Sequence, residues 1–337
     1  MKTKVLTSLA SVLLTLMLMT PANLFAENYV NVYSSRIEKL IKPAFDLFTK
    51  ETGIKVNFTT ASEAELIERL KAEEKYTKAD MLITVDAGNL WIAAKNNLLQ
   101  PVKSDILNSN IPSSLRDPLG QWYGLTVRSR TIVYSSERVT KSELSTYEDL
   151  GNPKWKNRLC LRTSKKVYNK SLIASMIKSL GQKKTEQIVS GWMKNDPKIY
   201  PKDSSLLNAI VAGKCDVGIV NTYYLGRQIV KNPKYPVTLF WANQKGRGVH
   251  VNISGAGVTK YAKRKNNSLK LLEFLSSKKA QNLFADNNLE YPANQNVKPS
   301  EQLIKWWGSF KQDQVNVASA GELQKDAVFL MTTLGYK

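Results

Sequence analysis

The sequence predicts an α/β protein built from two lobes, and three observations support this prediction. First, strand-like and helix-like segments alternate between residues 29 and 88, which is the order of a mostly parallel sheet with helical crossovers. Second, removal of a leader of 26 residues from the 337 would leave 311, and this exceeds the size at which one hydrophobic core usually keeps growing. Third, the alternation breaks over residues 116–139 and then restarts, as expected between two lobes.

Residues 1–26 have the order of a secretory signal peptide. Lys2 and Lys4 precede an apolar run, and a small residue, Ala26, stands at the expected cleavage position. The apolar run is short for a membrane span, and no later stretch is apolar enough to be one. A retained anchor or a lipoprotein is the alternative, but no cysteine near the cleavage position could carry a lipid. We therefore expect an exported, soluble protein that is cleaved after Ala26.

The first part of the mature chain predicts three strands and two helices. The first helix has apolar residues at helical spacing and Gly53 as a candidate C-cap, and the second opens with a Ser62–Glu65 capping box. Strands are recognised by alternation and by β-branched or aromatic residues. The expected order is strand 29–35, helix 36–53, strand 54–60, helix 62–74 and strand 79–88.

The second part restarts the same kind of pattern after a long apolar strand around residues 131–134. An apolar strand in "DVGIVNTYYLGR" is expected to end at the adjacent Tyr223 and Tyr224. Neighbouring side chains on a strand point to opposite faces, so two phenols at a strand end can converge only where the alternation stops. The other expected elements are a strand in 146–163, helix 167–181, a helix from 205, strand 250–262, helix 266–288 and a helical, Trp-rich end from about 300.

Charge and motifs narrow the function classes. The chain carries 49 Lys and Arg against 28 Asp and Glu, a net charge of +21 that falls to +19 without Lys2 and Lys4. Such an excess of positive charge is typical of proteins that bind anionic partners. The lysines are dispersed among asparagines, however, so we attribute the charge to a compositional bias and expect no nucleic-acid partner. The sequence contains no GxSxG, HExxH or P-loop motif, and one histidine, so we expect a binding protein and not an enzyme.

The two cysteines leave two alternatives open. Cys160 and Cys215 lie in strand-like runs and could form a disulfide in an oxidising compartment, which requires Cα atoms about 6 Å apart. The alternative is two small buried residues, and it is the one we favour from the sequence.

Eight segments follow one another along the chain: "VYSSR", "ADMLITVDAG", "RDPLGQWYGLTVRSR", "STYEDLGNPKWKNRLCLR", "VYNKSLIASMI", "NTYYLGR", "VNISGAGVTKYAK" and "LEFLSSKKAQNLFA". They extend from about Tyr33 to Tyr291 and so cover most of the mature chain. Together they resemble the corresponding segments of periplasmic ferric-iron-binding proteins, the solute-binding components of ABC importers. One such segment alone would be weak evidence, whereas the ordered series is specific.

The resemblance implies the type II solute-binding fold, in which two lobes joined by crossing strands enclose a ligand cleft. It places the first lobe at about 27–124 plus 249–337 and the second at about 125–248. The crossing segments would be "GLTVRSRTIVY" and "GVHVNISGAGV". By the same resemblance the protein is expected to be a monomer that captures Fe(III) and delivers it to an inner-membrane ABC permease.

The resemblance also implies the ligands: Tyr168 in "VYN" and Tyr223 and Tyr224 in "NTYY". Fe(III) is small and hard and prefers anionic oxygen, and a bound cation can hold a phenol deprotonated below its usual pKa of about 10. Three phenolates would balance the three charges of the ion. For each tyrosine taken alone, ordinary packing is the competing explanation.

One departure concerns the residues after "SSR", where relatives commonly carry His-Tyr and this chain has Ile37 and Glu38. A carboxylate is also a hard oxygen donor, so Glu38 is a candidate ligand. The alternative is a solvated residue at a helix N-terminus, where a negative charge suits the helix dipole. The single histidine, His250, is expected to be structural. Because the chain has only this one, a zinc site built on several histidines is excluded.

Arginines are expected around the tyrosine ligands, where they would contact an anion or the phenolates. Arg36, Arg128 and Arg130 occur in the matching segments, and guanidinium groups bind carboxylate-like anions in bidentate fashion. They would hold a carbonate or citrate ion against the iron, or stabilise the phenolates by their charge. For Arg128 and Arg130, the alternative is that they are surface charges on an edge strand. An alternative function keeps the fold and binds a small anion such as a phosphonate or sulfate, or another non-iron solute.

Overall fold

The computed structural model describes residues 28–337, and its centre is one mixed β-sheet. The predicted signal peptide lies outside the described residues. The strands are β1 (Tyr29–Ser34), β2 (Lys55–Thr60), β3 (Met81–Val85), β4 (Tyr123–Ser135), β5 (Leu159–Arg162), β6 (Lys198–Tyr200), β7 (Val217–Asn221), β8 (Val237–Phe240), β9 (Val251–Val258) and β10 (Tyr291–Pro292).

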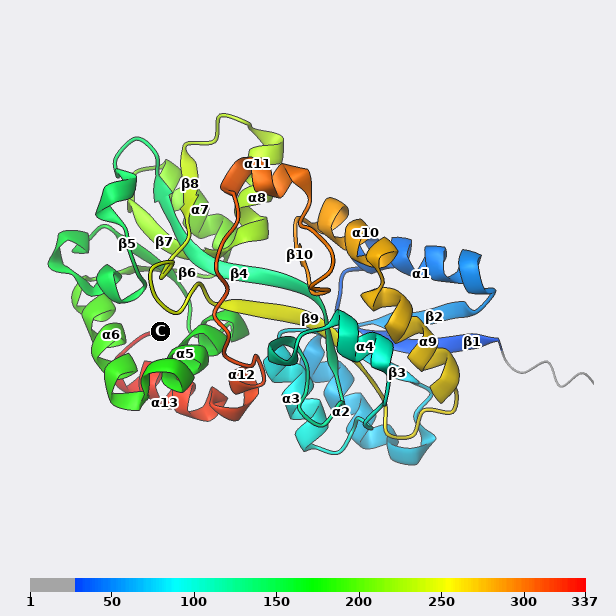
Figure 1. Ribbon diagram of the computed structural model, residues 1–337. Helices are drawn as coiled ribbons and strands as arrows, with labels where there is room; N and C mark the ends of the chain where they lie inside the picture. The colour runs from blue at the N-terminus through cyan, green and yellow to red at the C-terminus, as the bar shows by residue number, and fades with distance from the viewer. Residues whose placement is uncertain (1–27) are drawn as a thin grey trace, which may run out of the picture.

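The sheet has the order β2-β1-β3-β9-β4-β7-β5-β6, with β8 and β10 also paired to β4. The first three strands are parallel, as their strand–helix alternation predicts, and so are β5, β6 and β7. The prediction of a parallel arrangement for residues 29–88 is therefore confirmed, but it does not extend to the centre of the molecule. Strands β4 and β9 run antiparallel to each other and to the strands on either side, and they pass through the middle of the molecule (Figure 1).

Some helices begin or end at local sequence signals, but the single helix expected over 266–288 is two helices, α9 (Lys265–Ser276) and α10 (Lys278–Asn288), because Ser277 ends the first and caps the second. Gly53 ends α1 in the left-handed region at φ 69°, and its N–H donates to the carbonyl of Thr49. Ser62 and Glu65 form the predicted capping box of α2. The helices are α1 (Glu38–Thr52), α2 (Glu63–Glu73), α3 (Ala87–Lys95), α4 (Asp105–Asn110), α5 (Val167–Leu180), α6 (Gln182–Lys194), α7 (Asp203–Val211), α8 (Thr222–Lys231), α9 (Lys265–Ser276), α10 (Lys278–Asn288), α11 (Glu301–Trp307), α12 (Ser319–Glu322) and α13 (Gln324–Thr333).

Separate apolar cores at the two ends of the sheet give the two-lobe architecture of the type II fold, as predicted. One core packs α1, α2, α9 and α10 against the β1–β3 end, and Phe48 of α1 meets Phe274 of α9 at 5.4 Å between ring centroids. The other end buries Trp155, Trp192 and Ile173. Figure 1 shows these two helical bodies on either side of β4 and β9.

The lobe boundaries stay a prediction, and the chain end adds one observation about them. Helix α13 packs against α5, and Ala327 and Leu330 belong to the same apolar core as Trp192. The hydroxyl of Tyr336 donates to the carbonyl of Arg162 at 2.9 Å. The last residues therefore contact the second lobe, although the prediction counts them with the first.

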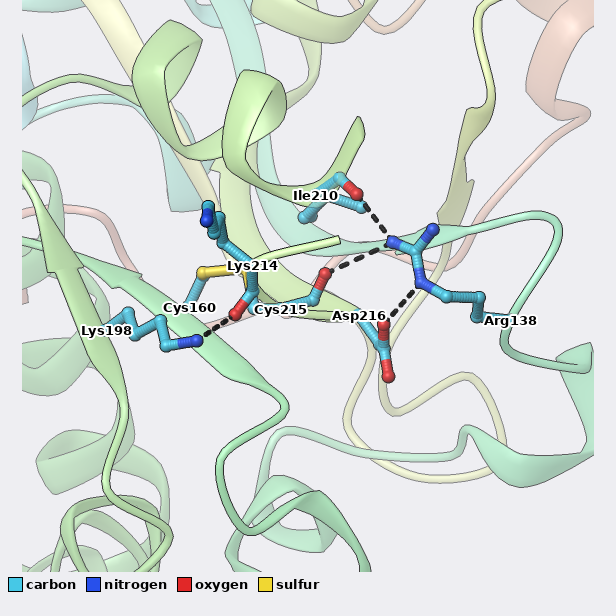
Figure 2. The surroundings of a disulfide bond; sticks show 7 residues. All are labelled: Arg138, Cys160, Lys198, Ile210, Lys214, Cys215 and Asp216. Carbon is cyan, nitrogen blue, oxygen red and sulfur yellow. Dashed lines mark hydrogen bonds and ion pairs between the residues drawn. A yellow bond between two sulfur atoms is a disulfide. The ribbon is translucent and has the colours of Figure 1, made fainter. Parts of the chain in front are cut away.

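Cys160 and Cys215 form a disulfide, with Cα atoms 5.9 Å apart. The favoured interpretation of two free, buried cysteines was therefore wrong. The bond joins β5 to the segment just before β7 (Figure 2). Beside it, Arg138 donates to the carboxylate of Asp216 at 2.6 Å. Sequence could not decide between the alternatives because 55 positions separate the cysteines.

A search of the described residues for membrane-spanning helices gave none of sufficient length and apolarity.

Candidate functional site

A pocket of about 170 Å³ brings together residues from both lobes. The first-lobe residues come from the carboxyl end of β1, the start of α2 and the end of β3, where ligands of open parallel sheets usually bind. Tyr168 comes from the start of α5, and Tyr223, Tyr224 and Arg227 come from the first two turns of α8. Arg128 comes from β4, and Glu290 stands just before β10. We call it the tyrosine pocket, and its lining is Ser35, Arg36, Ile37, Leu40, Glu63, Val85, Arg128, Tyr168, Tyr223, Tyr224, Arg227 and Glu290.

The three predicted tyrosines all line this pocket. Tyr168 is the second residue of α5, and Tyr223 and Tyr224 lie in the first turn of α8. The Tyr223 hydroxyl donates to the Tyr168 hydroxyl at 3.4 Å, and the rings of Tyr223 and Tyr224 are 4.5 Å apart between centroids. The predicted position at a strand end needs a correction, because β7 stops at Asn221 and a helix begins at Thr222. Successive helical side chains diverge by about 100°, so both rings can lie at one pocket.

Burial keeps the phenol of Tyr223 protonated when no cation is bound. Burial raises the pKa of Tyr223 well above its usual range, the hydroxyls of Tyr168 and Tyr224 add to the rise, and the charge of Arg128 opposes it. A cation in the pocket would therefore have to displace this proton, which a highly charged metal ion can do.

A polar network on β4 holds the segments that carry the tyrosines. Arg130 donates to the side-chain oxygen of Asn169 at 2.8 Å and to that of Asn221 at 3.3 Å. Asn221 in turn donates to the Tyr223 hydroxyl at 3.3 Å. Arg130 also pairs with Asp203 at 3.2 Å and does not line the pocket. Its contacts are with the segments that carry the tyrosines, and its burial rules out the surface-charge alternative.

Arg36 and Arg128 do line the pocket, and both pair with one buried carboxylate. Arg36 contacts Glu290 at 2.7 Å, and Arg128 contacts its other oxygen at 3.5 Å. Burial alone would raise the pKa of Glu290, but the two guanidinium charges outweigh it and lower that pKa. Arg128 additionally lies 5.8 Å above the ring of Tyr168. The cluster keeps positive charge beside the phenols without leaving it unpaired.

Glu38 and His250, which the sequence singled out, lie outside the pocket lining. Glu38 is the exposed first residue of α1, at the position where a negative charge favours the helix dipole. His250 is buried just before β9, and burial, with help from the charges of Arg247 and Arg130, lowers its pKa to about 3. Among residues 28–337 no group of three or more His, Cys, Asp or Glu could hold a metal ion.

Sequence reasoning missed three charged residues of the pocket: Glu63, Arg227 and Glu290. Arg227 lies over the rings of Tyr223 and Tyr224, at 5.0 and 5.9 Å from their centroids. Its position three residues after Tyr224 was a usable signal, because residues three apart share a helix face. Glu63 follows the predicted cap Ser62, just after the carboxyl end of β2. This position was also a usable signal, because ligands of open α/β sheets bind at the carboxyl ends of the strands. No local signal identifies Glu290.

Comparisons with known proteins agree on one family. The family of bacterial extracellular solute-binding proteins matches residues 76–314. Iron uptake protein A1 of Synechocystis sp. is 39% identical over 317 residues, which cover 91% of this chain and 87% of that protein.

Two solved structures superpose closely. The Trichodesmium FutA protein, in complex with iron and citrate ligands, is 42% identical with a TM-score of 0.88, over 92% of this chain and 100% of the other. Ferric iron-binding protein A of Mannheimia haemolytica, in an open conformation, is 36% identical with a TM-score of 0.86, over 92% and 99% of the two chains.

Proposed function

Because the chain belongs to the family of bacterial extracellular solute-binding proteins, we propose that it captures Fe(III) in the tyrosine pocket through phenolate oxygens. The observation that carries this proposal is the meeting of three phenols, from two helices, in one pocket that also holds cationic side chains. Similarity to an iron uptake protein and to ferric-binding proteins supports iron as the solute.

The donor set fits the ion. Fe(III) prefers hard, anionic oxygen, and Tyr168, Tyr223 and Tyr224 offer three such atoms once they lose their protons. Three phenolates neutralise the charge of the ion, so the buried complex avoids the cost of an uncompensated charge. Each captured ion should release protons, because burial raises the pKa of Tyr223 in the empty pocket.

Arginines in the pocket suit an accompanying anion. Lining guanidiniums come from Arg36, Arg128 and Arg227, against the two carboxylates of Glu63 and Glu290. This leaves one positive charge when iron is balanced by three phenolates. A carbonate or citrate ion could bind beside the iron and balance this charge. The Trichodesmium relative is described with iron and citrate together.

The remaining steps follow from the fold. The two lobes would close over the ion by a hinge motion across β4 and β9 and then deliver it to an ABC permease in the inner membrane. We expect the mature protein to act in the periplasm as a monomer. This role requires no catalysis, since capture and release are binding steps.

A small anion as the only solute is the second candidate, favoured by the three lining arginines. Two of them, however, are already paired with Glu290. An anion alone could use the three phenols only as hydrogen-bond donors, whereas Fe(III) would use them as anionic ligands. Iron capture accounts for both sets of side chains.

Titration of the purified mature protein with ferric nitrilotriacetate tests the proposal. We expect one tightly held iron per chain, retained against added EDTA, and a visible phenolate-to-iron absorption band. A colourless protein that retains no iron, but binds sulfate or a phosphonate, would support the second candidate instead.

A further inference from the structure

The three phenols of the tyrosine pocket all come from α5 and α8, so the opposite, first-lobe side needs a donor of its own. The only carboxylates in the pocket lining are Glu63 and Glu290. Glu290 is buried and engaged with Arg36 and Arg128. Within residues 28–337, Glu63 makes no hydrogen bond and no ion pair, so its carboxylate is available to a ligand.

The start of α2 presents Glu63 to the pocket. Strands β1 and β2 are parallel and end side by side at Ser34 and Thr60, so the helices that follow begin at the same edge. The capping box uses the side chains of Ser62 and Glu65, which leaves that of Glu63 out of the helix cap. A half-exposed side chain at this edge can turn toward the pocket without breaking a contact.

We propose that Glu63 is the first-lobe oxygen ligand of the bound Fe(III), facing the phenolates of α5 and α8. This inference rests on the proposed function. A carboxylate is a hard anionic donor of the kind that Fe(III) prefers. As a fourth anion it would give the complex one negative charge, and the guanidinium of Arg227 lies beside Tyr223 and Tyr224 to balance it.

The chain contains a matched control for this residue. Glu38 and Glu63 are each the first residue of a helix, α1 and α2, so both interact with a helix N-terminus in the same way. Only Glu63 lines the tyrosine pocket. Glu63→Gln and Glu38→Gln therefore remove the same charge from equivalent helix positions and differ in their access to the metal.

Iron titration of the two variants tests the inference. We expect Glu63→Gln to weaken Fe(III) retention against EDTA by about tenfold or more, and Glu38→Gln to change it less than about twofold. The visible band of Glu63→Gln should also move to longer wavelength, because loss of an anionic donor makes the iron a better electron acceptor. Unchanged thermal unfolding of the iron-free variants would confirm that folding is intact.

Two outcomes would overturn parts of the account separately. If both variants match the wild type in iron retention and in the position of the visible band, Glu63 is not a ligand. If iron retention by the wild type and both variants then depends on added carbonate or citrate, the first-lobe ligand is that anion. If the wild type itself develops no visible band, the proposed function fails before the role of Glu63 is reached.

Discussion

The hydroxyl of Tyr223 donates to the hydroxyl of Tyr168 at 3.4 Å across 55 positions of sequence. The two meet because β5 and β7 are neighbouring parallel strands, and each leads into the helix that carries one of the phenols. The Cys160–Cys215 disulfide joins the same two segments near their other ends. The second lobe thus builds its face of the site from one strand pair.

Removal of the phenol oxygens should weaken iron binding. Tyr168→Phe and Tyr223→Phe each delete one anionic donor, so we expect the visible band to lose intensity and Fe(III) retention to fall about tenfold or more. The measurement is an EDTA competition monitored by absorbance. Tyr261→Phe, at an exposed tyrosine outside the pocket, is the control and should match the wild type.

Loss of the disulfide should destabilise the protein. In Cys160→Ala/Cys215→Ala, the unfolded chain regains the freedom of a long loop, and the free energy of unfolding should fall by about 2–4 kcal/mol. Urea denaturation followed by circular dichroism measures this. Dithiothreitol should lower the wild-type midpoint in the same way, and an unaltered midpoint in both cases would show that the bond adds no stability.

Asp203 should be important for folding, because it is completely buried and pairs with Arg130 at 3.2 Å and with Arg162 at 2.9 Å. Asp203→Asn leaves two buried guanidiniums without a counter-charge, and we expect a loss of about 3–5 kcal/mol in the free energy of unfolding. Asp46→Asn removes an exposed carboxylate paired with Lys42 and should cost at most about 0.5 kcal/mol. Equal costs for the two variants would contradict the role given to the buried network.

His250 should make stability depend on pH. Burial lowers its pKa to about 3 in the folded protein, against about 6.5 in the unfolded chain. Between these values the unfolded chain binds more protons, so stability is complete above about pH 6.5 and falls as the pH is lowered, by up to about 1.4 kcal/mol per pH unit.

His250→Gln removes this contribution. The unfolding free energy of the wild type should therefore fall by about 1.6 kcal/mol more than that of the variant from pH 6.5 to pH 5. Urea denaturation at both values measures it. Parallel pH profiles for the two proteins would show that His250 does not titrate in this range on unfolding.

Local signals were sufficient for much of the fold. The alternation of strands and helices predicted the parallel arrangement of β1 to β3, and Gly53 and Ser62 marked helix ends that the structure contains. The antiparallel direction of β4 and β9 was not predictable in this way, since direction depends on how the two lobes are connected.

Site residues were predictable where they lie in a segment that resembles the family. Tyr168, Tyr223 and Tyr224 were named from their segments and line one pocket. The burial of Arg130 depends on Asp203, which lies 73 positions away. Glu290 likewise meets Arg36 across 254 positions. Such pairings come from tertiary packing, and no local pattern encodes them.

The resonance Raman spectrum of the iron-loaded protein, excited within its visible band, tests the central claim most directly. If Tyr168, Tyr223 and Tyr224 hold the Fe(III), the spectrum should show enhanced ring vibrations of metal-bound phenolate, and these should disappear in the triple Phe variant. An iron-loaded wild-type protein whose spectrum lacks phenolate vibrations would contradict the account.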